Sequence, residues 1–87
     1  MYILVFGNSF LISAKKIEKR TKVQLQKCLE IFSKEPFHPK LRTKPLTGKL
    51  VGFYSFRLSK DYRVIFKFAE GKVIVLLRVK HRKDVYK

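Results

Sequence analysis

The residues best suited to chemistry in this sequence are cations in its C-terminal part. They recur among apolar residues instead of forming one run, so a strand would direct many of them to one surface. Guanidinium and ammonium groups neutralise phosphates and stabilise the extra charge of a pentavalent phosphorus transition state. The set that suits a phosphodiester substrate is Arg57, Arg63, Lys67, Arg78, Lys80, His81, Arg82 and Tyr86.

Cleavage of RNA without a metal needs a base for the 2′-hydroxyl, an acid for the leaving oxygen and cations for the phosphate. A histidine such as His81 can exchange a proton near neutral pH. A lysine does so only where burial or neighbouring cations depress its pKa. Candidates for stacking on a splayed base are Tyr54, Tyr62, Phe53 and Tyr86. Tyr54 and Tyr62 fall on the expected apolar face, which favours a core position for them. A structural alternative also stands, in which Arg63 pairs with Asp61 or another surface acid.

Several other site types are absent from the sequence. It contains no Walker loop, GxGxxG or GxSxG motif, and its two histidines stand far apart without nearby acids or cysteines, so no metal or cofactor site is expected. Asp61 and Glu70 fall in different turns and form no carboxylate pair of the kind that glycosidases use. The single cysteine, Cys28, excludes an internal disulfide, and the cytoplasm is the expected location.

The elements that must position the cations are three alternating runs bounded by turn residues, typical of strands with two unlike faces. In the first two runs the expected apolar face holds Tyr54, Phe56, Leu58, Tyr62, Val64, Phe66 and Phe68, opposite Phe53, Ser55, Arg57, Arg63, Ile65 and Lys67. In the third run we expect Val73, Val75, Leu77 and Val79 on the apolar face and Ile74, Leu76, Arg78 and Lys80 on the other. Pairing of the three runs then gives a sheet with a basic working face open to solvent or ligand.

The N-terminal half predicts one strand and two helices. Residues 2–6 form an apolar run that reads as a strand, and Ser9 and Thr21 are candidate N-caps of the two helices. The second helix has a core-facing stripe of Leu25, Cys28, Leu29 and Phe32. Residues 34–44 read as a loop because Pro36 and Pro39 disfavour a helix there. The prediction is one α+β domain over residues 1–87 in the order β-α-α-β-β-β, with a helix hairpin on a mainly antiparallel four-stranded sheet.

Composition restricts the partners. The 87 residues carry 21 Lys+Arg against 6 Asp+Glu, a formal net charge of +15. A compact domain with this excess repels itself unless an anionic partner relieves the repulsion, which favours nucleic acid, an acidic protein or both in turn. A merely solvated basic surface is the alternative. No apolar run approaches the ~20 residues of a membrane span, and the N-terminus does not read as a signal peptide.

Residues 48–66 read GKLVGFYSFRLSKDYRVIF, and a further strand and the segment HRKDVY follow them. This combination resembles the RelE/ParE superfamily of bacterial and archaeal toxins, and PFHPKLRTKPLTGKL ahead of it is similar to the lead-in of the RelE- and YafQ-like branch. The resemblance implies a toxin of a type II toxin–antitoxin system with two helices packed on an antiparallel sheet, bound by an acidic antitoxin. For the RelE-like branch it implies metal-independent mRNA cleavage, usually in the ribosomal A site, by attack of a 2′-hydroxyl.

The resemblance also assigns roles. Arg63 matches the arginine that holds the scissile phosphate, and Arg57 falls where relatives place a general base, although a guanidinium is a poor base. Arg82 matches a general acid or charge stabiliser, and Tyr86 matches the terminal aromatic residue that stacks on a base or orients the 2′-hydroxyl. His81 flanks the site and could supply the missing base, as could the ribosome. The remaining candidates for phosphate binding are Lys67, Arg78, Lys80 and Ser55. At the position of Ser55, some relatives have a lysine.

Three functions follow from these observations. The first is a ribosome-associated mRNA endoribonuclease, which the basic cluster with its terminal tyrosine favours. The second is a ParE-like inhibitor of DNA gyrase that cleaves nothing and needs no phosphate site. The third is a non-catalytic RNA-binding module on a similar sheet.

Overall fold

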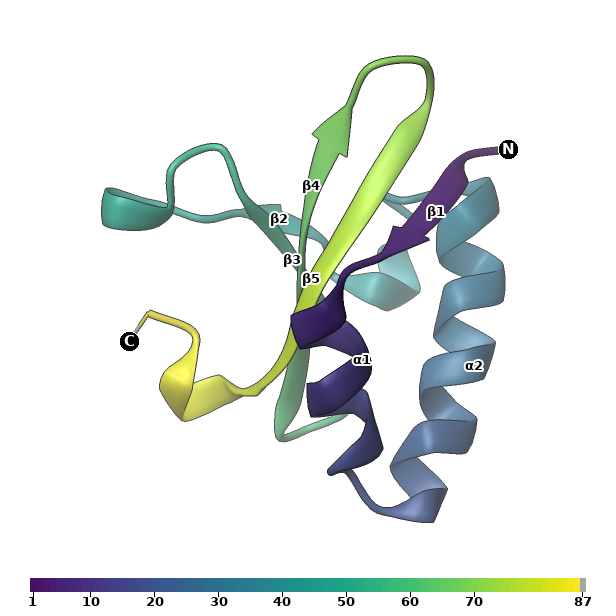
Figure 1. The fold of residues 1–87 in the computed structure, drawn as a ribbon, viewed down its shortest axis with the longest axis vertical. Helices are drawn as coiled ribbons and strands as arrows, with labels where there is room; N and C mark the ends of the chain where they lie inside the picture. The colour runs from purple at the N-terminus through teal and green to yellow at the C-terminus, as the bar shows by residue number, and fades with distance from the viewer. Residues whose placement is uncertain (87) are drawn as a thin grey trace.

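The computed structural model describes residues 1–86 and has the predicted α+β class (Figure 1). The sheet has five strands in the order β1-β5-β4-β3-β2, with β1 parallel to β5 and the other pairs antiparallel. Four strands were predicted, and the additional one is the two-residue β2, which pairs with Ser55 and Tyr54. The elements are β1 (Ile3–Phe6), α1 (Asn8–Lys15), α2 (Lys19–Lys34), β2 (Lys44–Pro45), β3 (Tyr54–Arg57), β4 (Tyr62–Ala69) and β5 (Val73–His81), with 3₁₀ turns η1 (Pro39–Leu41), η2 (Gly48–Leu50) and η3 (Arg82–Asp84).

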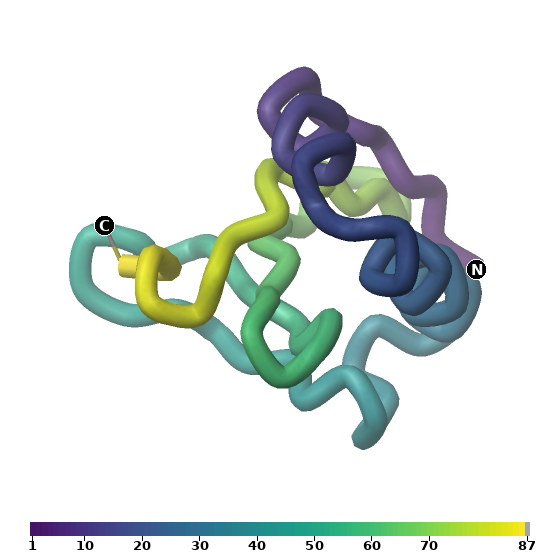
Figure 2. The backbone as a smooth tube through the Cα atoms, turned by 90° about the horizontal axis from the view of Figure 1, so that it is seen from below, coloured from purple at the N-terminus to yellow at the C-terminus, as the bar shows by residue number. Residues whose placement is uncertain are grey.

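Both helices cover one face of the sheet, as the hairpin prediction required, but each begins earlier than expected (Figures 1 and 2). Gly7 and Glu18 occupy the N-cap positions, so the predicted caps Ser9 and Thr21 lie inside the helices. Thr21 is buried against the core, and Ile17 is buried in the short connection between the helices. Burial of these two side chains holds the start of α2 against the sheet, which local capping preference alone does not predict.

The main core lies between the helices and the sheet. Phe32 of α2 is fully buried, and its ring centroid lies 4.7 Å from those of both Phe56 and Phe66. Leu25 and Cys28 complete the buried stripe of α2 that the sequence predicted. Aromatic rings at these distances pack in tilted and edge-on arrangements that add to the free energy of burial.

The third alternating run does not present the faces that were expected. Ile74 and Leu76 are fully buried in the main core, whereas Val75 and Leu77 are only half-buried on the other face. The pairing of β4 with β5 jumps from Phe66↔Leu76 to Ile65↔Arg78, so Leu77 has no partner on β4. This β-bulge resets the alternation, and Val79 therefore joins Ile74 and Leu76 in the core.

The face of the sheet away from the helices is not fully open. A second apolar cluster of Leu46, Ile65 and Val85 is buried there, with Leu50, Phe53 and Leu77 packed around it. The C-terminal turn lies beside the loop that leads from β2 to β3, and residues of these two segments cover this face of the sheet (Figure 2). The predicted basic face is thus divided by an apolar cluster, and cations on its two sides belong to different surfaces.

Candidate nucleic-acid interface

Cations from four parts of the chain line two adjoining depressions, which we call together the arginine cleft. One depression, of about 270 Å³, is lined by Arg42, Lys44, Ser55, Arg57 and Arg63. The other, of about 120 Å³, is lined by Lys44, Ser55, Arg63, Arg82, Val85 and Tyr86. The sheet explains the convergence, because Arg57 pairs with Arg63 and Lys44 pairs with Ser55, which turns each pair to the same face.

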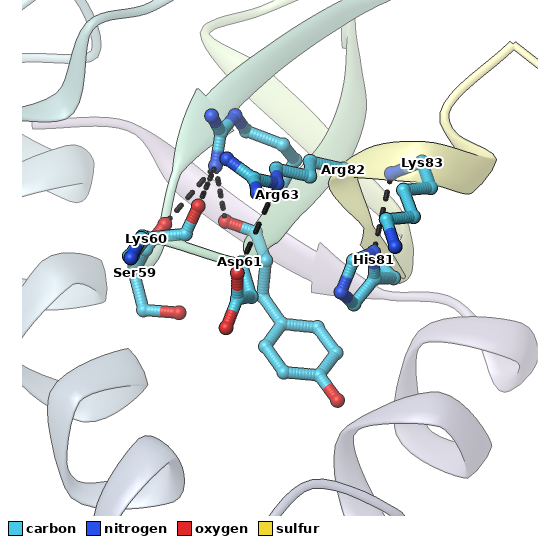
Figure 3. Close-up of polar contacts among 8 residues, drawn as sticks. Ser59, Lys60, Asp61, Arg63, His81, Arg82 and Lys83 are labelled. Atoms are coloured by element: carbon cyan, nitrogen blue, oxygen red, sulfur yellow. Dashed lines mark hydrogen bonds and ion pairs between the residues drawn. The ribbon is translucent and has the colours of Figure 1, made fainter.

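Arg63 is the central side chain of the cleft, and the turn between β3 and β4 fixes its position. Its Nη1 donates to the carbonyl oxygens of Ser59, at 3.0 Å, and Tyr62, at 3.1 Å (Figure 3). All hydrogen bonds of its guanidinium within residues 1–86 use Nη1. The Nη2 and Nε groups are therefore available to an anion, and a planar guanidinium can present two donors to one phosphate.

Cations outnumber anions in the electrostatic environment of Arg63. Burial lowers the pKa of Arg63, and the charges of Arg57, Arg82 and Arg42 lower it further, while Asp61 opposes the change. An arginine stays protonated despite such a shift. Arg57, Arg82 and Arg42 thus repel the Arg63 guanidinium, and a bound anion would relieve this repulsion.

Asp61 is engaged by Arg82 and not by Arg63, contrary to the structural alternative raised from the sequence. Arg82 Nε lies 3.8 Å from Asp61 Oδ1, and the Arg82 amide donates to the Asp61 carbonyl at 2.7 Å. Figure 3 shows Arg82 beside Arg63, above the turn that carries Asp61. The β3–β4 turn thus positions both arginines, one through its carbonyls and one through its carboxylate.

Ser55 and Tyr86 form the floor and the rim of the cleft. Ser55 is 1% exposed, and no hydrogen bond of its hydroxyl occurs within residues 1–86. Tyr86 is 58% exposed at the end of the described chain. A hydroxyl at the floor can donate to a phosphate, and an exposed ring at the rim can stack on a base.

The structure does not bring His81 into the cleft. Strand alternation turns His81 away from Lys80 and towards Tyr62, and the two ring centroids are 5.6 Å apart. Its Nδ1 accepts from the Lys83 amide at 3.2 Å, so His81 caps η3 (Figure 3). This position does not support the predicted role of His81 as a base.

Three further predicted phosphate ligands lie outside the cleft. Lys80 Nζ donates to the Asp84 carbonyl at 3.2 Å and lines a separate hollow of about 340 Å³ between β5 and the apolar cluster. Arg78 lines the same hollow, where its Nη2 lies 3.4 Å from the Ser9 hydroxyl. Lys67 is exposed further along β4, opposite Val75. The apolar cluster separates these cations from Arg63, because Val85 lines both the hollow and the cleft.

Sequence reasoning missed Arg42 and Lys44, although both line the cleft. They fall in the segment that was read as a loop, and nothing in their spacing links them to the sheet. Arg42 ends η1 with a left-handed backbone, φ 50°, and Lys44 belongs to β2. Within residues 1–86, no three His, Cys, Asp or Glu side chains lie close enough to hold a metal ion, and no helix there is long and apolar enough to cross a membrane.

Comparison with solved structures defines the class of fold. The archaeal RelE in the RelE–RelB complex from Pyrococcus horikoshii OT3 matches with a TM-score of 0.78 and 26% identity, over 95% of this chain and 97% of that one. YafQ from E. coli strain BL21(DE3) matches with a TM-score of 0.79 and 16% identity, over all of both chains. The E. coli DinJ–YafQ toxin–antitoxin complex matches with a TM-score of 0.77 and 17% identity, over 99% of this chain and 98% of that one. The fold is therefore RelE-like.

A family model then identifies the chain more closely. The model described as the ParE toxin of the type II toxin–antitoxin system parDE matches residues 5–86, so the chain belongs to this family. A search of curated protein sequences gave no match. The resemblance to the RelE/ParE superfamily is thus confirmed, and the protein is a toxin of a type II toxin–antitoxin system.

Proposed function

We propose that this toxin is a RelE-type mRNA endoribonuclease that acts on ribosome-bound messages in the cytoplasm. The observation that carries the proposal is the convergence of Arg57, Arg63 and Arg82 on one cleft with Ser55 at its floor. An inhibitor that only binds a protein surface has no need of several guanidinium groups gathered around a serine hydroxyl with a single carboxylate near them. A phosphodiester supplies the negative charge that this arrangement lacks.

In the proposed complex Arg63 holds the scissile phosphate through Nη2 and Nε while the turn carbonyls fix Nη1. Arg57 and Arg82 lie on either side of it and offset the charge that builds up on the phosphorane oxygens. Tyr86 stacks on the adjoining base or orients the 2′-hydroxyl. Contacts with the β3–β4 turn hold Arg63 and Arg82 in place before the substrate arrives, so these two side chains need little reorganisation during the reaction.

The reaction is an attack of the 2′-oxygen on the adjacent phosphorus. The bond from phosphorus to the 5′-oxygen breaks, and the products are a 2′,3′-cyclic phosphate and a 5′-hydroxyl. A base takes the proton from the 2′-hydroxyl, and an acid gives a proton to the leaving 5′-oxygen. Lys44 and Tyr86 are side chains of the cleft that can exchange a proton, unlike an arginine. The proposal gives the two transfers to these residues or to groups of the ribosome.

Inhibition of DNA gyrase is the second candidate function, and two observations favour it. The matching family model is that of ParE, and the cleft contains no histidine or carboxylate among the residues that line it. A gyrase inhibitor would leave messages intact and would act on DNA supercoiling instead.

The two functions separate in one experiment with two arms. Purified toxin is added to a translating ribosome extract with an end-labelled message, and in parallel to purified gyrase with relaxed plasmid. The proposal expects message fragments with 2′,3′-cyclic phosphate and 5′-hydroxyl ends, and unchanged supercoiling. Intact messages together with blocked supercoiling would establish the gyrase reading and exclude the nuclease.

The proposal includes an acidic antitoxin as the physiological partner. Two of the similar structures are toxin complexes, one with RelB and the other with DinJ. One sheet edge is protected, because β2 has only two residues and one is Pro45, but the β1 edge is not. Ile3 is 62%, Val5 44% and Phe6 46% exposed along β1. An antitoxin segment with apolar and acidic residues can cover this edge and offset the net charge of +15.

Substitution along β1 tests where such a partner binds. The antitoxin would be taken from an open reading frame beside the toxin, and complex formation would be measured by calorimetry. Val5→Glu should weaken binding at least tenfold, since it places a charge on an apolar edge and repels an acidic partner, while Glu30→Gln on the exposed face of α2 should have little effect. Equal affinity of the Val5 variant and the wild type would exclude this edge.

A further inference from the structure

A groove beside the arginine cleft carries cations that the proposed reaction does not use. It has a volume of about 280 Å³ and lies between α2 and the segment that carries η1 and the end of β3. Its cations are Lys27, Lys40, Arg42 and Arg57, and none of the residues that line it is acidic. We call it the α2 groove.

The α2 groove and the arginine cleft form one track, because Arg42 and Arg57 line both. The track runs from Tyr86 and Arg82, past Arg63, to the lysines on α2 and η1. It leaves the sheet at the β3 end and passes over to the helix side of the molecule. A chain of phosphates bound at Arg63 can therefore continue along it without leaving a cationic surface.

Within the described part of the chain, the cations of the α2 groove form no ion pair. The ion pairs found within residues 1–86 join His38 with Glu35 and Arg82 with Asp61, and they include none of the four. Lys27 and Lys40 are exposed. Charges placed together without acids cost stability through self-repulsion, and a polyanion relieves that cost.

The floor of the α2 groove is neutral and largely apolar. Cys28, Leu41 and Leu58 are buried there. Burial raises the pKa of the Cys28 thiol, although a hydrogen bond from Gln24 opposes this, so the thiol adds no charge. Such a floor gives few groups that could read base edges, whereas a rim of cations suits a sugar–phosphate backbone of any sequence.

We propose that the α2 groove binds the single-stranded RNA backbone that flanks the cleaved linkage on one side. The inference rests on the proposed ribonuclease function and extends its substrate beyond the linkage held at Arg63. It predicts that a longer RNA gains more affinity when it is extended in one direction than in the other. At the opposite end, past Val85, the adjoining hollow is lined mainly by apolar side chains, and its cations Arg78 and Lys80 donate to the Ser9 hydroxyl and the Asp84 carbonyl. The gain should be independent of sequence and sensitive to salt.

Binding of uncleavable oligouridines tests the proposal. The probes are 2′-O-methyl trinucleotides and the same trinucleotides extended by six residues at either the 5′ or the 3′ end. The groove variant is Lys27→Ala with Lys40→Ala, and the control is Lys15→Ala with Lys16→Ala, which removes the same charge from exposed positions at the end of α1. Thermal melting verifies that each protein is folded.

The groove variant should lose about tenfold in affinity for one extended probe and keep wild-type affinity for the trinucleotide. The negative slope of log K against log salt for that probe should become less steep by about 1.4, since two phosphate contacts on a single strand are lost. The control variant should match the wild type. Equal losses of affinity in the groove variant and the control would overturn the proposal. So would a groove variant that binds extended RNA normally and loses affinity only for an acidic antitoxin. In either case, trinucleotide binding would still support the arginine cleft. Failure of the wild type to bind any probe would overturn the groove proposal, whereas message cleavage in the translating extract tests the ribonuclease function separately.

Discussion

At the scale of single residues, Arg63 joins the fold to the proposed chemistry. Its Nη1 is held by the carbonyls of the β3–β4 turn, and its remaining donors face a cleft crowded with Arg57, Arg82 and Arg42. A guanidinium that is fixed on one side and free on the other is suited to grip a phosphate in one orientation. Lysine cannot reproduce this arrangement, because its ammonium group lacks the planar pair of donors.

Arg63→Ala is expected to lower kcat/KM for message cleavage by about 100-fold or more, which corresponds to about 3 kcal/mol of lost transition-state stabilisation. Arg63→Lys should recover only part of this loss. Stability should change little, because the loss of hydrogen bonds to the turn is offset by relief of repulsion among the arginines. Cleavage at the wild-type rate by a folded Arg63→Ala protein would remove the residue from the mechanism.

Ser55→Ala separates a functional hydroxyl from a structural one. Ser55 is buried, but its hydroxyl has no hydrogen-bond partner within residues 1–86, so its removal should leave the melting temperature unchanged. If the hydroxyl donates to the bound phosphate, cleavage should fall by about tenfold, the effect expected of one hydrogen bond to a charged group. A drop in stability with unchanged cleavage would show that Ser55 is a packing residue alone.

At the scale of elements, the bulge at Leu77 decides which side chains of β5 are buried. Ile74→Ala should therefore cost about 2–4 kcal/mol of unfolding free energy, because it leaves a cavity in the main core. The neighbouring Val75→Ala should cost less than about 1.5 kcal/mol, since Val75 is half-buried on the other face. Urea titrations of the two variants measure the loss of unfolding free energy. A larger loss for Val75→Ala than for Ile74→Ala would instead support the uninterrupted alternation expected from the sequence.

The alternating pattern predicted β3 and β4 correctly because each places charged or polar residues against aromatic ones. Arg57 and Arg63 contrast with Phe56 and Val64, and this contrast fixes the face. Residues 73–77 are all apolar, so their pattern cannot distinguish the two faces of the strand. Leu77, which is not in the main core, packs against the second apolar cluster. The strand β2 has no periodicity to detect, since its two residues become a strand only by pairing with β3.

At the scale of the whole molecule, the fold carries its charge of +15 with one Arg–Asp ion pair and one His–Glu contact found within residues 1–86. The isolated toxin should therefore become more stable as salt screens its self-repulsion. Raising NaCl from about 50 mM to about 500 mM shortens the screening length from about 14 Å to about 4 Å and should raise the melting temperature. Sucrose at matched osmolarity provides the uncharged control, and an equal rise in both solutions would argue against charge repulsion.

The candidate site could be predicted only where the strands carry it. Arg57 and Arg63 face each other across β3 and β4, so alternation and pairing sufficed for them, and Arg82 follows β5 directly. Arg42 and Lys44 reach the cleft through η1 and β2, which depend on tertiary contacts. Lys67, Arg78 and Lys80 were assigned to the same face, but the second apolar cluster, formed by distant segments, lies between them and Arg63.

The central claim is that the converging arginines grip an RNA linkage. The most direct measurement compares message cleavage in a translating extract by three proteins: the wild type, Arg63→Ala with Arg82→Ala, and the charge-matched control Lys15→Ala with Lys16→Ala. Cleavage by the wild type and the control, with at least a 100-fold lower rate for the folded arginine variant, is the result we predict. Cleavage by the folded arginine variant at the wild-type rate would contradict it.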